Sequence, residues 1–313
     1  MRLTLILTVA LLATVALSLT VGVGSLQDLS LQGTLLELRG ARLAAALLAG
    51  AALAAGGVVV QGLFRNPLAS PSVLGTTAGA TVGGQLALIV AALTALPIPP
   101  DLIIPLGCLF GALGSLAFLL FVLRVSDDLL ALLLAGFVLS SLFLSAGSFL
   151  TSLAQDSWSL GRAVVTFTLG GVSGVGLRQI ALVAPLILVS IAACWVWGRP
   201  LDLLLSGEEE AQSLGVDVPR VRWWVAVWVS ALVAGATSLG GSIAFVGLVV
   251  PHAVRPFAGV QHRRLLPVAA LAGATFVAMA DVLTRVIPSV GEIPLGVVTG
   301  LIGAPVFLVL LLR

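Results

Sequence analysis

The polar segment 199–222 is the longest polar stretch in the chain, and its residue types are those of a short capped helix. Its central sequence is SGEEEAQSLGVDVPR. Three glutamates in a row suit the positive end of a helix dipole, and Ser206 and Glu209 have the spacing of a capping box. We therefore expect a helix of about eight residues ending at Gly215, and a second helix beginning near Asp217–Pro219. The segment is either a solvated connector or a docking element for a cytosolic partner.

A second motif, QGLFRNPLASP at positions 61–71, places two polar residues directly before prolines. Asn66 before Pro67 predicts one helix start, and Ser70 before Pro71 predicts another, because a side-chain oxygen can cap free N–H groups and proline is tolerated in the first turn. The motif is either a tight turn between two helices or a rigid corner that contacts a partner or lines a gate. Small residues follow it, and these let membrane helices approach closely or line a wide cavity.

Charged pairs occur near the ends of two apolar stretches. Arg39 and Arg42 are three residues apart and share a face if their segment is helical. Asp281 and Arg285 are four residues apart, a spacing that allows an ion pair along one helix. Charges at membrane depth are costly and tend to be functional. The paired arginines either contact lipid headgroups or dock an acidic partner.

Residues that commonly hold metals are few and scattered. His252 and His262 are ten residues apart, outside the spacing of a zinc-binding helix. Cys108 and Cys194 lie in separate apolar stretches, which predicts neither a disulfide framework nor a metal site. His252 follows Pro251 in the motif GSIAFVGLVVPHAVR, where a single histidine is more often a hydrogen-bonded structural residue than a ligand.

Several classes of enzyme are also disfavoured. The chain has no lysine, which excludes a phosphate-binding loop of the GxxxxGK[ST] type and Schiff-base catalysis by lysine. Because we find neither paired carboxylates nor a serine–histidine arrangement, an intramembrane enzyme is a weak hypothesis.

The overall composition is that of a helical membrane protein. Of its 313 residues, 59% are hydrophobic and only 9% are charged, whereas soluble domains are about 25% charged. The mean hydropathy is +1.21. A globular protein needs a polar shell that this composition cannot supply. The apolar stretches are continuous for about 20 residues and do not alternate, so they predict membrane helices and not a barrel. A net charge of +2 makes nucleic acid an improbable partner.

Ten stretches are long and apolar enough to cross a bilayer, and we predict one all-α membrane domain over residues 1–313. The stretches are 3–24, 43–63, 73–96, 102–123, 129–153, 179–198, 223–240, 243–257, 265–287 and 295–312. The seventh and eighth are separated at Gly240–Gly241, since glycines weaken a helix and permit sharp turns. With both termini in the cytoplasm, this division places ten arginines inside and five outside, whereas fusion of the two stretches places seven inside and eight outside.

Six ordered motifs resemble the permease subunits of type II ATP-binding-cassette (ABC) importers, the group that handles iron–siderophore complexes, haem and vitamin B12. The motifs are AGAALAAGGVVVQGLFRNPLASPSVLG (49–75), GEEEAQSLGV (207–216), FVGLVVPHAVR (245–255), HRRLLP (262–267), ADVLTR (280–285) and EIPLGVVTGLIGAPVF (292–307). The resemblance covers roughly residues 35–313. It implies a homo- or heterodimer of ten-helix subunits around a central pathway in the bacterial cytoplasmic (inner) membrane.

The resemblance also implies a function and partners. The chain would be the membrane-spanning subunit of an ATP-driven importer that moves a metal chelate from a periplasmic or lipid-anchored binding protein into the cytoplasm. An iron–siderophore complex is the favoured cargo, with haem and cobalamin as alternatives. ATP and Mg would be bound by separate cytoplasmic ATPase subunits, so this chain would bind no cofactor and would not itself be an enzyme.

The family motifs further imply roles for residues at matching positions. Coupling to the ATPase is implied for Gly207, Glu208, Glu209, Glu210, Leu214 and Gly215. Docking of the binding protein, through outward-facing side chains, is implied for Arg39, Arg42 and Arg285. A role along the translocation pathway, or in its structural support, is implied for Gln61, Asn66, Pro67, Gly75, Pro251 and His252.

An ion-coupled secondary transporter is the main alternative. Such proteins place ion-coupling groups at mid-membrane, often on broken helices. Apart from Asp281 and Arg285, the interiors of the predicted spans carry almost no ionisable side chains, which counts against proton coupling. Sodium sites built from backbone carbonyls remain compatible with the sequence.

Overall fold

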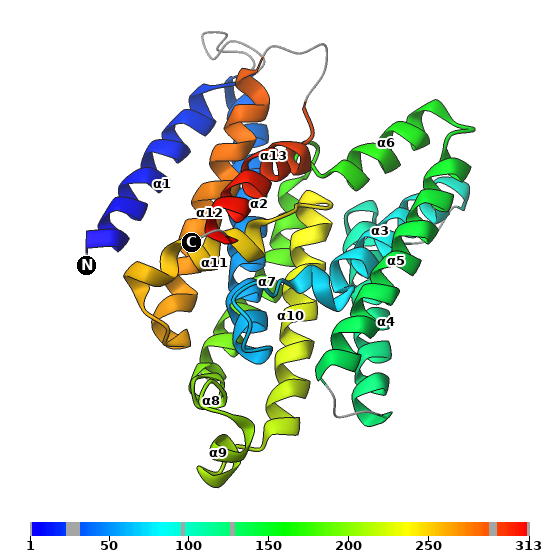
Figure 1. Ribbon diagram of the computed structural model, residues 1–313. Coiled ribbons are helices and arrows are strands. Elements are labelled where there is room, and N and C mark those ends of the chain that lie inside the picture. Colours follow the sequence, from blue (N-terminus) through cyan, green and yellow to red (C-terminus); the bar gives the residue numbers. More distant parts are fainter. Residues whose placement is uncertain (1, 23–31, 95–97, 126–128, 288–292, 312–313) are drawn as a thin grey trace.

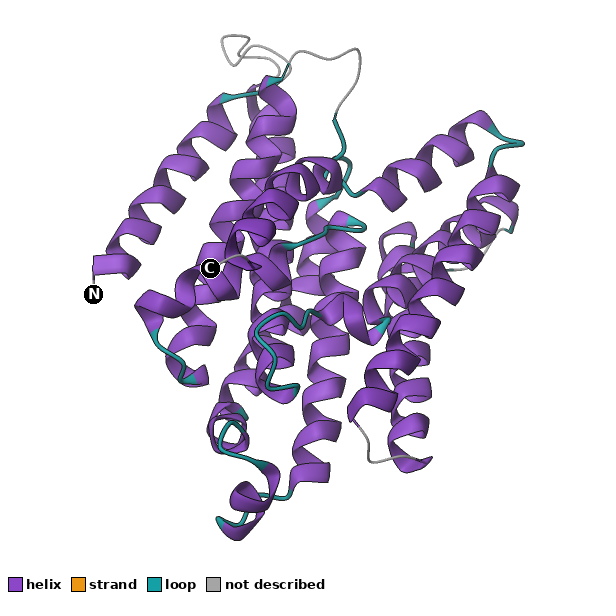
Figure 2. Cartoon of the chain, in the orientation of Figure 1, coloured by secondary structure: helices purple, strands orange, loops and turns teal. Residues whose placement is uncertain are grey.

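The computed structural model describes residues 2–22, 32–94, 98–125, 129–287 and 293–311, and these contain helices and no β-strand (Figures 1 and 2). In chain order the helices are α1 (Arg2–Thr20), α2 (Gln32–Leu63), the 3-10 helix η1 (Pro71–Leu74), α3 (Thr76–Leu93), α4 (Pro100–Val125), α5 (Leu129–Ala154), α6 (Trp158–Leu169), α7 (Leu177–Val196), α8 (Gly198–Leu204), α9 (Glu208–Ser213), α10 (Val218–Gly240), α11 (Val246–Ala258), α12 (His262–Val286) and α13 (Leu295–Leu311). The predicted all-α class is confirmed.

Each of the ten predicted stretches corresponds to one observed helix. Within the described ranges, eight helices are long and apolar enough to cross a membrane, namely α1 to α5, α7, α10 and α12. The remaining two, α11 and α13, are shorter apolar helices. Helices α6 and α8 were not predicted, because helices of 12 and 7 residues are too short to be recognised as spans.

The core of the bundle is formed by α2, α10 and α12, and glycines set the distances between neighbouring helices. A Cβ atom added at Gly50 of α2 would lie 2.2 Å from the carbonyl oxygen of Gly273 on α12. Likewise, a Cβ atom at Gly83 of α3 would lie 2.0 Å from the carbonyl oxygen of Gly107 on α4. These helices therefore pack backbone against backbone, as small residues allow in membranes.

The predicted break between the seventh and eighth spans is confirmed. Helix α10 ends at Gly240, and Gly241 has a φ of +62°, a left-handed value that glycine adopts without strain. A Cβ atom at 241 would also lie 2.2 Å from the carbonyl oxygen of Phe167, so the turn packs tightly on the end of α6. The chain resumes helical structure at Val246 and runs for only 13 residues in α11.

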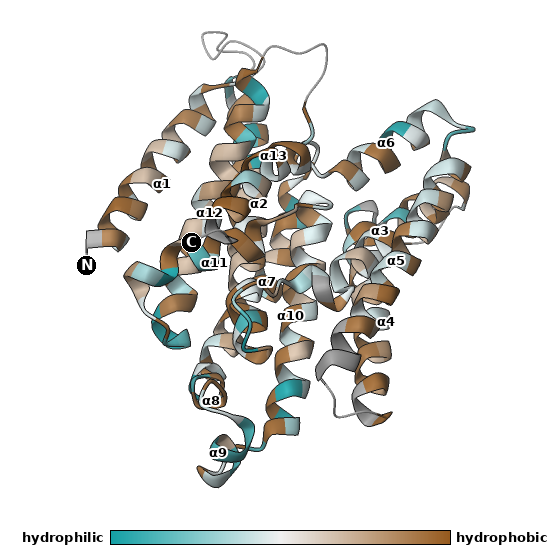
Figure 3. Ribbon diagram, in the orientation of Figure 1, coloured by the Kyte–Doolittle hydropathy of each residue, from teal (hydrophilic) through white to brown (hydrophobic). Residues whose placement is uncertain are grey.

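Tryptophans mark one level of the bundle, close to the end that carries α9. The Trp197 and Trp224 rings stack with centroids 6.5 Å apart, and Trp224 also contacts Trp228 at 6.1 Å. Arg263 lies over the Trp195 ring, 4.8 Å from its centroid. Tryptophan and arginine at one level are typical of a membrane–water interface. Polar residues gather beyond this level, at the start of α10 and in α9 (Figure 3).

Candidate functional site

The polar segment after α8 forms a projection from the bundle, and α9 is its tip (Figure 1). The three predicted coupling glutamates form the first turn of α9. Gly215 has a φ of +85°, so the chain leaves this region in the left-handed conformation, as predicted. The predicted capping box is wrong: Gly207, with a φ of +132°, is the N-cap residue, which leaves Ser206 outside the helix. The helix consequently has six residues, fewer than the predicted eight or so.

Charge pairs attach α9 to the bundle. Glu208 accepts a hydrogen bond from Arg222 of α10, and it also lies 3.6 Å from the guanidinium of Arg65 in the 61–71 corner. Glu209 and Glu210 are exposed, and the side chain of Leu214 is 61% exposed. One face of the projection is thus fixed by ion pairs, while the opposite face presents two carboxylates and a leucine to solvent.

A second ion pair joins α8 to the beginning of α12. Asp202 accepts hydrogen bonds from the main-chain N–H of His262 at 2.8 Å and from its ring Nδ1 at 2.6 Å. Burial raises the pKa of Asp202, but the hydrogen bonds from His262 and the charges of His262 and Arg263 outweigh it, so the pKa lies below its ordinary value. His262 packs on α2 at Gly62, where a Cβ atom would lie only 2.0 Å from ring Nε2.

The corner between α2 and α3 is held to α11 by polar contacts. Gln61 is buried, donates to the carbonyl oxygen of Leu248 at 3.3 Å and accepts from Arg255 at 2.6 Å. The helix start predicted at Asn66 is wrong. The Asn66 side chain instead accepts from the N–H of Leu68 at 2.9 Å, which forms a local turn.

The second predicted helix start in this corner is confirmed as η1. Ser70 is its N-cap residue, in extended conformation, and Pro71 occupies its first turn. Gly75 ends η1 with a φ of +71° and is followed directly by α3. Pro67 is exposed at the tip of the corner.

The corner lies beside α11, which contains the other two predicted pathway residues. Pro251 is buried within α11, and His252 is half-buried next to it. Among the described residues no group of three histidine, cysteine or acidic side chains could hold a metal ion.

A cavity of about 650 Å³ lies between α3, α5 and α6. It extends along α5 from Ser140 to Ser152, which corresponds to about 18 Å of helix axis. Within the described part of the chain its walls carry no charged side chain. Its polar lining residues are Ser72, Thr77, Thr81, Gln85, Ser140, Ser148, Thr151, Ser152, Gln155, Thr168 and Ser242.

A smaller cavity of about 210 Å³ continues from the first toward the corner. The two share Ser72, Thr77 and Ser242, and the smaller one is also lined by Ser70 and Pro71. The corner motif therefore lines a cavity adjacent to the one along α5.

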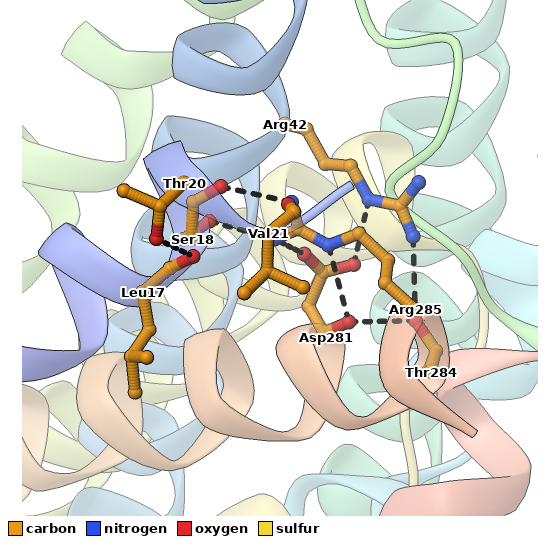
Figure 4. Close-up of polar contacts among 8 residues, drawn as sticks. All are labelled: Leu17, Ser18, Thr20, Val21, Arg42, Asp281, Thr284 and Arg285. Atoms are coloured by element: carbon orange, nitrogen blue, oxygen red, sulfur yellow. Dashed lines mark hydrogen bonds and ion pairs between the residues drawn. The ribbon is translucent and has the colours of Figure 1, made fainter. Parts of the chain in front are cut away.

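At the end of the bundle opposite α9, a charged cluster connects α2 and α12 (Figure 4). Arg42 donates from Nε to one oxygen of Asp281 at 2.8 Å, and Arg285 donates to the other at 2.6 Å. The predicted ion pair between Asp281 and Arg285 is confirmed. Arg42 also donates to the hydroxyl of Thr284 at 3.3 Å.

The same cluster caps the end of α1. Arg285 donates to the carbonyl oxygens of Ser18 and Val21 at 3.0 and 2.9 Å (Figure 4). Arg39 donates to the carbonyl oxygens of Leu19 and Thr20 at 2.8 and 3.1 Å. Guanidinium groups here satisfy carbonyls that have no partner within the helix, at the negative end of its dipole.

The outward orientation expected for these three arginines is not observed. Arg39 is 6% exposed, and the side chains of Arg42 and Arg285 are 15% and 6% exposed. The physical reason is that Asp281 and the carbonyl end of α1 recruit the guanidinium groups inside the subunit. A role in docking another protein stays a prediction.

Two functional candidates were missed in the sequence. Gln85 is the one amide within the predicted span 73–96, and a polar residue at membrane depth is a signal that could have identified it. The pair formed by Asp202 and His262 joins residues 60 positions apart, and nothing in their spacing predicts it.

Comparison with known proteins agrees with this architecture. The model of the FecCD transport family matches residues 2–313. The Fe(3+) dicitrate transport system permease protein FecD of Escherichia coli is 39% identical over 280 residues, which cover 89% of this chain and 85% of that protein. The vitamin B12 import system permease protein BtuC of Klebsiella pneumoniae is 39% identical over 318 residues, which cover 98% and 92% of the two chains.

A solved structure has the same fold over its whole length. It shows an inward-facing conformation of a protein described as a metal-chelate type ABC transporter, with a TM-score of 0.87 and 33% sequence identity. The match covers 100% of this chain and 99% of that one. The chain therefore belongs to the FecCD transport family and is a multi-pass membrane permease of the ABC transporter class.

Proposed function

We propose that this permease is the membrane-spanning subunit of an ATP-driven importer that carries a metal chelate into the cytoplasm. The observation that carries the proposal is the family match over residues 2–313. The hollow along α5 and the projecting α9 support it, because an importer needs both a path through the membrane and a surface for an ATPase. The chelate is an iron–siderophore complex, with haem and cobalamin as the alternatives.

The proposed ATPase contact is the exposed face of the α9 projection. Glu208 is bound to Arg222, so movement of α9 is transmitted directly to the first turns of α10, a core helix of the bundle. Glu209, Glu210 and Leu214 supply the exposed surface, and Gly207 and Gly215 turn the chain at its two ends. ATP and Mg are bound by the ATPase subunit, since a chain without lysine has no P-loop.

The other partners are a second permease subunit and a binding protein that delivers the chelate. The second subunit covers the exposed faces of helices such as α5, whose most apolar part is only 17% buried in the single chain. The binding protein docks at the end that carries Arg39, Arg42 and Arg285. The positive charge of the cluster supports this docking. Among the described residues that contact Asp281, two guanidinium groups share its one carboxylate.

The experiment that tests the proposal is chelate uptake by proteoliposomes that contain the permease, its ATPase and its binding protein. We expect uptake that requires ATP and that persists when ionophores remove the proton and sodium gradients. Uptake that follows an ion gradient without ATP would establish the secondary-transporter alternative. ATP-dependent movement of chelate outward would contradict the direction proposed here.

A further inference from the structure

Five hydroxyl groups along the wall of the α5 cavity share one hydrogen-bonding pattern. All five donate their protons to helix carbonyls four residues earlier, at distances of 2.7 to 3.0 Å. They belong to Thr81, Ser140, Ser148, Thr151 and Thr168. A hydroxyl that has donated its proton presents only its lone pairs to the cavity. These five hydroxyls therefore face the cavity as hydrogen-bond acceptors, whereas Ser152 and Gln155, which also line it, keep their donors.

Gln85 adds the strongest acceptor to this surface. It is 1% exposed, and its side-chain NH₂ donates to the hydroxyl oxygens of Thr168 at 2.6 Å and Thr151 at 3.4 Å. Both hydroxyls have already donated their own protons, so they can only accept, which fixes the NH₂ group of Gln85 on them. Its carbonyl oxygen Oε1 is consequently turned away from them, and it is buried without a hydrogen-bond partner among the described residues.

Gly147 leaves the space beside this buried carbonyl oxygen free of a side chain. A Cβ atom at position 147 would lie 2.9 Å from Oε1 of Gln85, and Gly147 itself lines the cavity. A buried carbonyl oxygen without a donor costs free energy, so it favours any cavity occupant that brings an N–H or O–H group.

We propose that this acceptor wall is a cargo subsite, built around Gln85, that selects chelates with outward-facing amide N–H or hydroxyl donors and no net negative charge. The inference rests on the proposed transport function and deepens it by naming the chemistry of the cargo. A carboxylate facing the five hydroxyls and the carbonyl oxygen of Gln85 meets acceptors there and loses its hydration without compensation. A neutral chelate rimmed with amides exchanges its water contacts for contacts with Gln85 and the hydroxyls. Neutral ferric hydroxamates and cobalamin share this chemistry, whereas ferric dicitrate and haem present carboxylates.

The test measures binding of radiolabelled chelates to the full importer in nanodiscs, without the binding protein, so that any selection belongs to the permease. The probes are cyanocobalamin, a neutral ferric trihydroxamate and ferric dicitrate. We expect one of the two neutral probes to bind at least about tenfold more tightly than dicitrate, a ratio equivalent to about 1.4 kcal/mol. Binding of cyanocobalamin would indicate a cobalamin importer, and binding of the trihydroxamate would indicate a siderophore importer. Equal or tighter binding of dicitrate overturns the subsite.

Variants assign the selection to particular atoms. Gln85→Leu removes the acceptor, and Gly147→Ala covers it with a methyl group, and each should weaken binding of the neutral probe about tenfold. Ser145→Ala is the matched control, because Ser145 makes the same hydrogen bond on α5 but does not line the cavity. If Gln85→Leu fails to fold, Gly147→Ala and the wild-type comparison still decide the question. If Gly147→Ala and Ser145→Ala behave alike, the inference is wrong.

The same preparation separates failure of this inference from failure of the proposed function. Proteoliposomes that take up chelates with ATP but without regard to charge would retain the importer and refute the subsite. Proteoliposomes that take up no chelate at all, combined with absence of binding by every probe, would refute both.

Discussion

Asp281 is the carboxylate on which two guanidinium groups converge inside the bundle, and its own side chain is 1% exposed. Removal of one partner from a buried ion pair leaves an uncompensated charge, at a cost of about 3–5 kcal/mol. We expect Asp281→Asn to destabilise the protein by about this amount, measured by thermal unfolding in detergent. The double variant Asp281→Asn/Arg285→Gln should lose less than the sum of its single changes, because the residues interact. Additive losses would show that the pair is not coupled.

Asp202 provides a prediction about pH. Its pKa is lowered in the folded protein, so its contribution to stability is complete above the ordinary aspartate pKa and disappears as the pH falls through the lowered value. We expect Asp202→Asn to cost about 1 kcal/mol at pH 7. The difference in unfolding temperature between the variant and the wild type should close below about pH 4. A difference that persists unchanged at pH 3 would show that the carboxylate charge is irrelevant.

At the scale of helices, the glycine contact between α2 and α12 limits what residue 50 can be. The carbonyl oxygen of Gly273 would lie 2.2 Å from a Cβ atom there, so Gly50→Ala must push two core helices apart. We expect a loss of about 1–3 kcal/mol, as for overpacked cores, measured by thermal unfolding. Gly40→Ala in the same helix is the control, since a Cβ atom at 40 has no neighbour within 4 Å. Alanine at 40 should be neutral or slightly stabilising.

The α9 projection gives a second prediction at this scale. Gly215 has a φ of +85°, which proline cannot adopt, so Gly215→Pro should change the path of the chain after α9. Coupling between distant sites is typically worth about 1–3 kcal/mol, and we expect chelate uptake per ATP hydrolysed to fall about 5–150-fold. Gly174→Pro is the control, because Gly174 has a φ of +84° in the loop between α6 and α7. Equal losses in both variants would argue for a general defect.

Structural elements could be predicted where neighbouring residues in the sequence determine them, and not where distant contacts do. The break after Gly240 could be predicted because a glycine pair acts on its own backbone, and the ten apolar helices because each stretch is apolar by itself. The N-cap predicted for α9 at Ser206 was wrong, because Gly207 occupies that position with a φ of +132°, which glycine adopts readily. Arg39 and Arg285 are buried because they contact the chain at the end of α1, which lies 17 and 264 positions away from them in the sequence. The local sequence does not show where that end lies in space.

At the scale of the molecule, the bundle has two chemically distinct ends, and this allows a test of topology. Gln261 lies at the α9 end, because the neighbouring His262 contacts Asp202 of α8. In a background without Cys108 and Cys194, a cysteine replacing the exposed Gln261 should be labelled from the cytoplasm, like one replacing Glu209. A cysteine replacing Asp156, between α5 and α6, should be labelled from the other side. Labelling of positions 209 and 261 from opposite sides would contradict the helix order described above.

The attachment of α1 constrains the order in which the protein is made. Along the most apolar part of α1 only 11% is buried, and its carbonyl end is capped by Arg285, a residue 264 to 267 positions later in the chain. At a synthesis rate of about 5–20 residues per second, roughly 13 to 53 seconds separate translation of the two. During that interval the first helix leaves the ribosome without its final neighbour. The contacts of α1 with Arg39 of α2 can form early, but those with α12 form only after α12 has entered the bilayer, so α1 reaches its final position late.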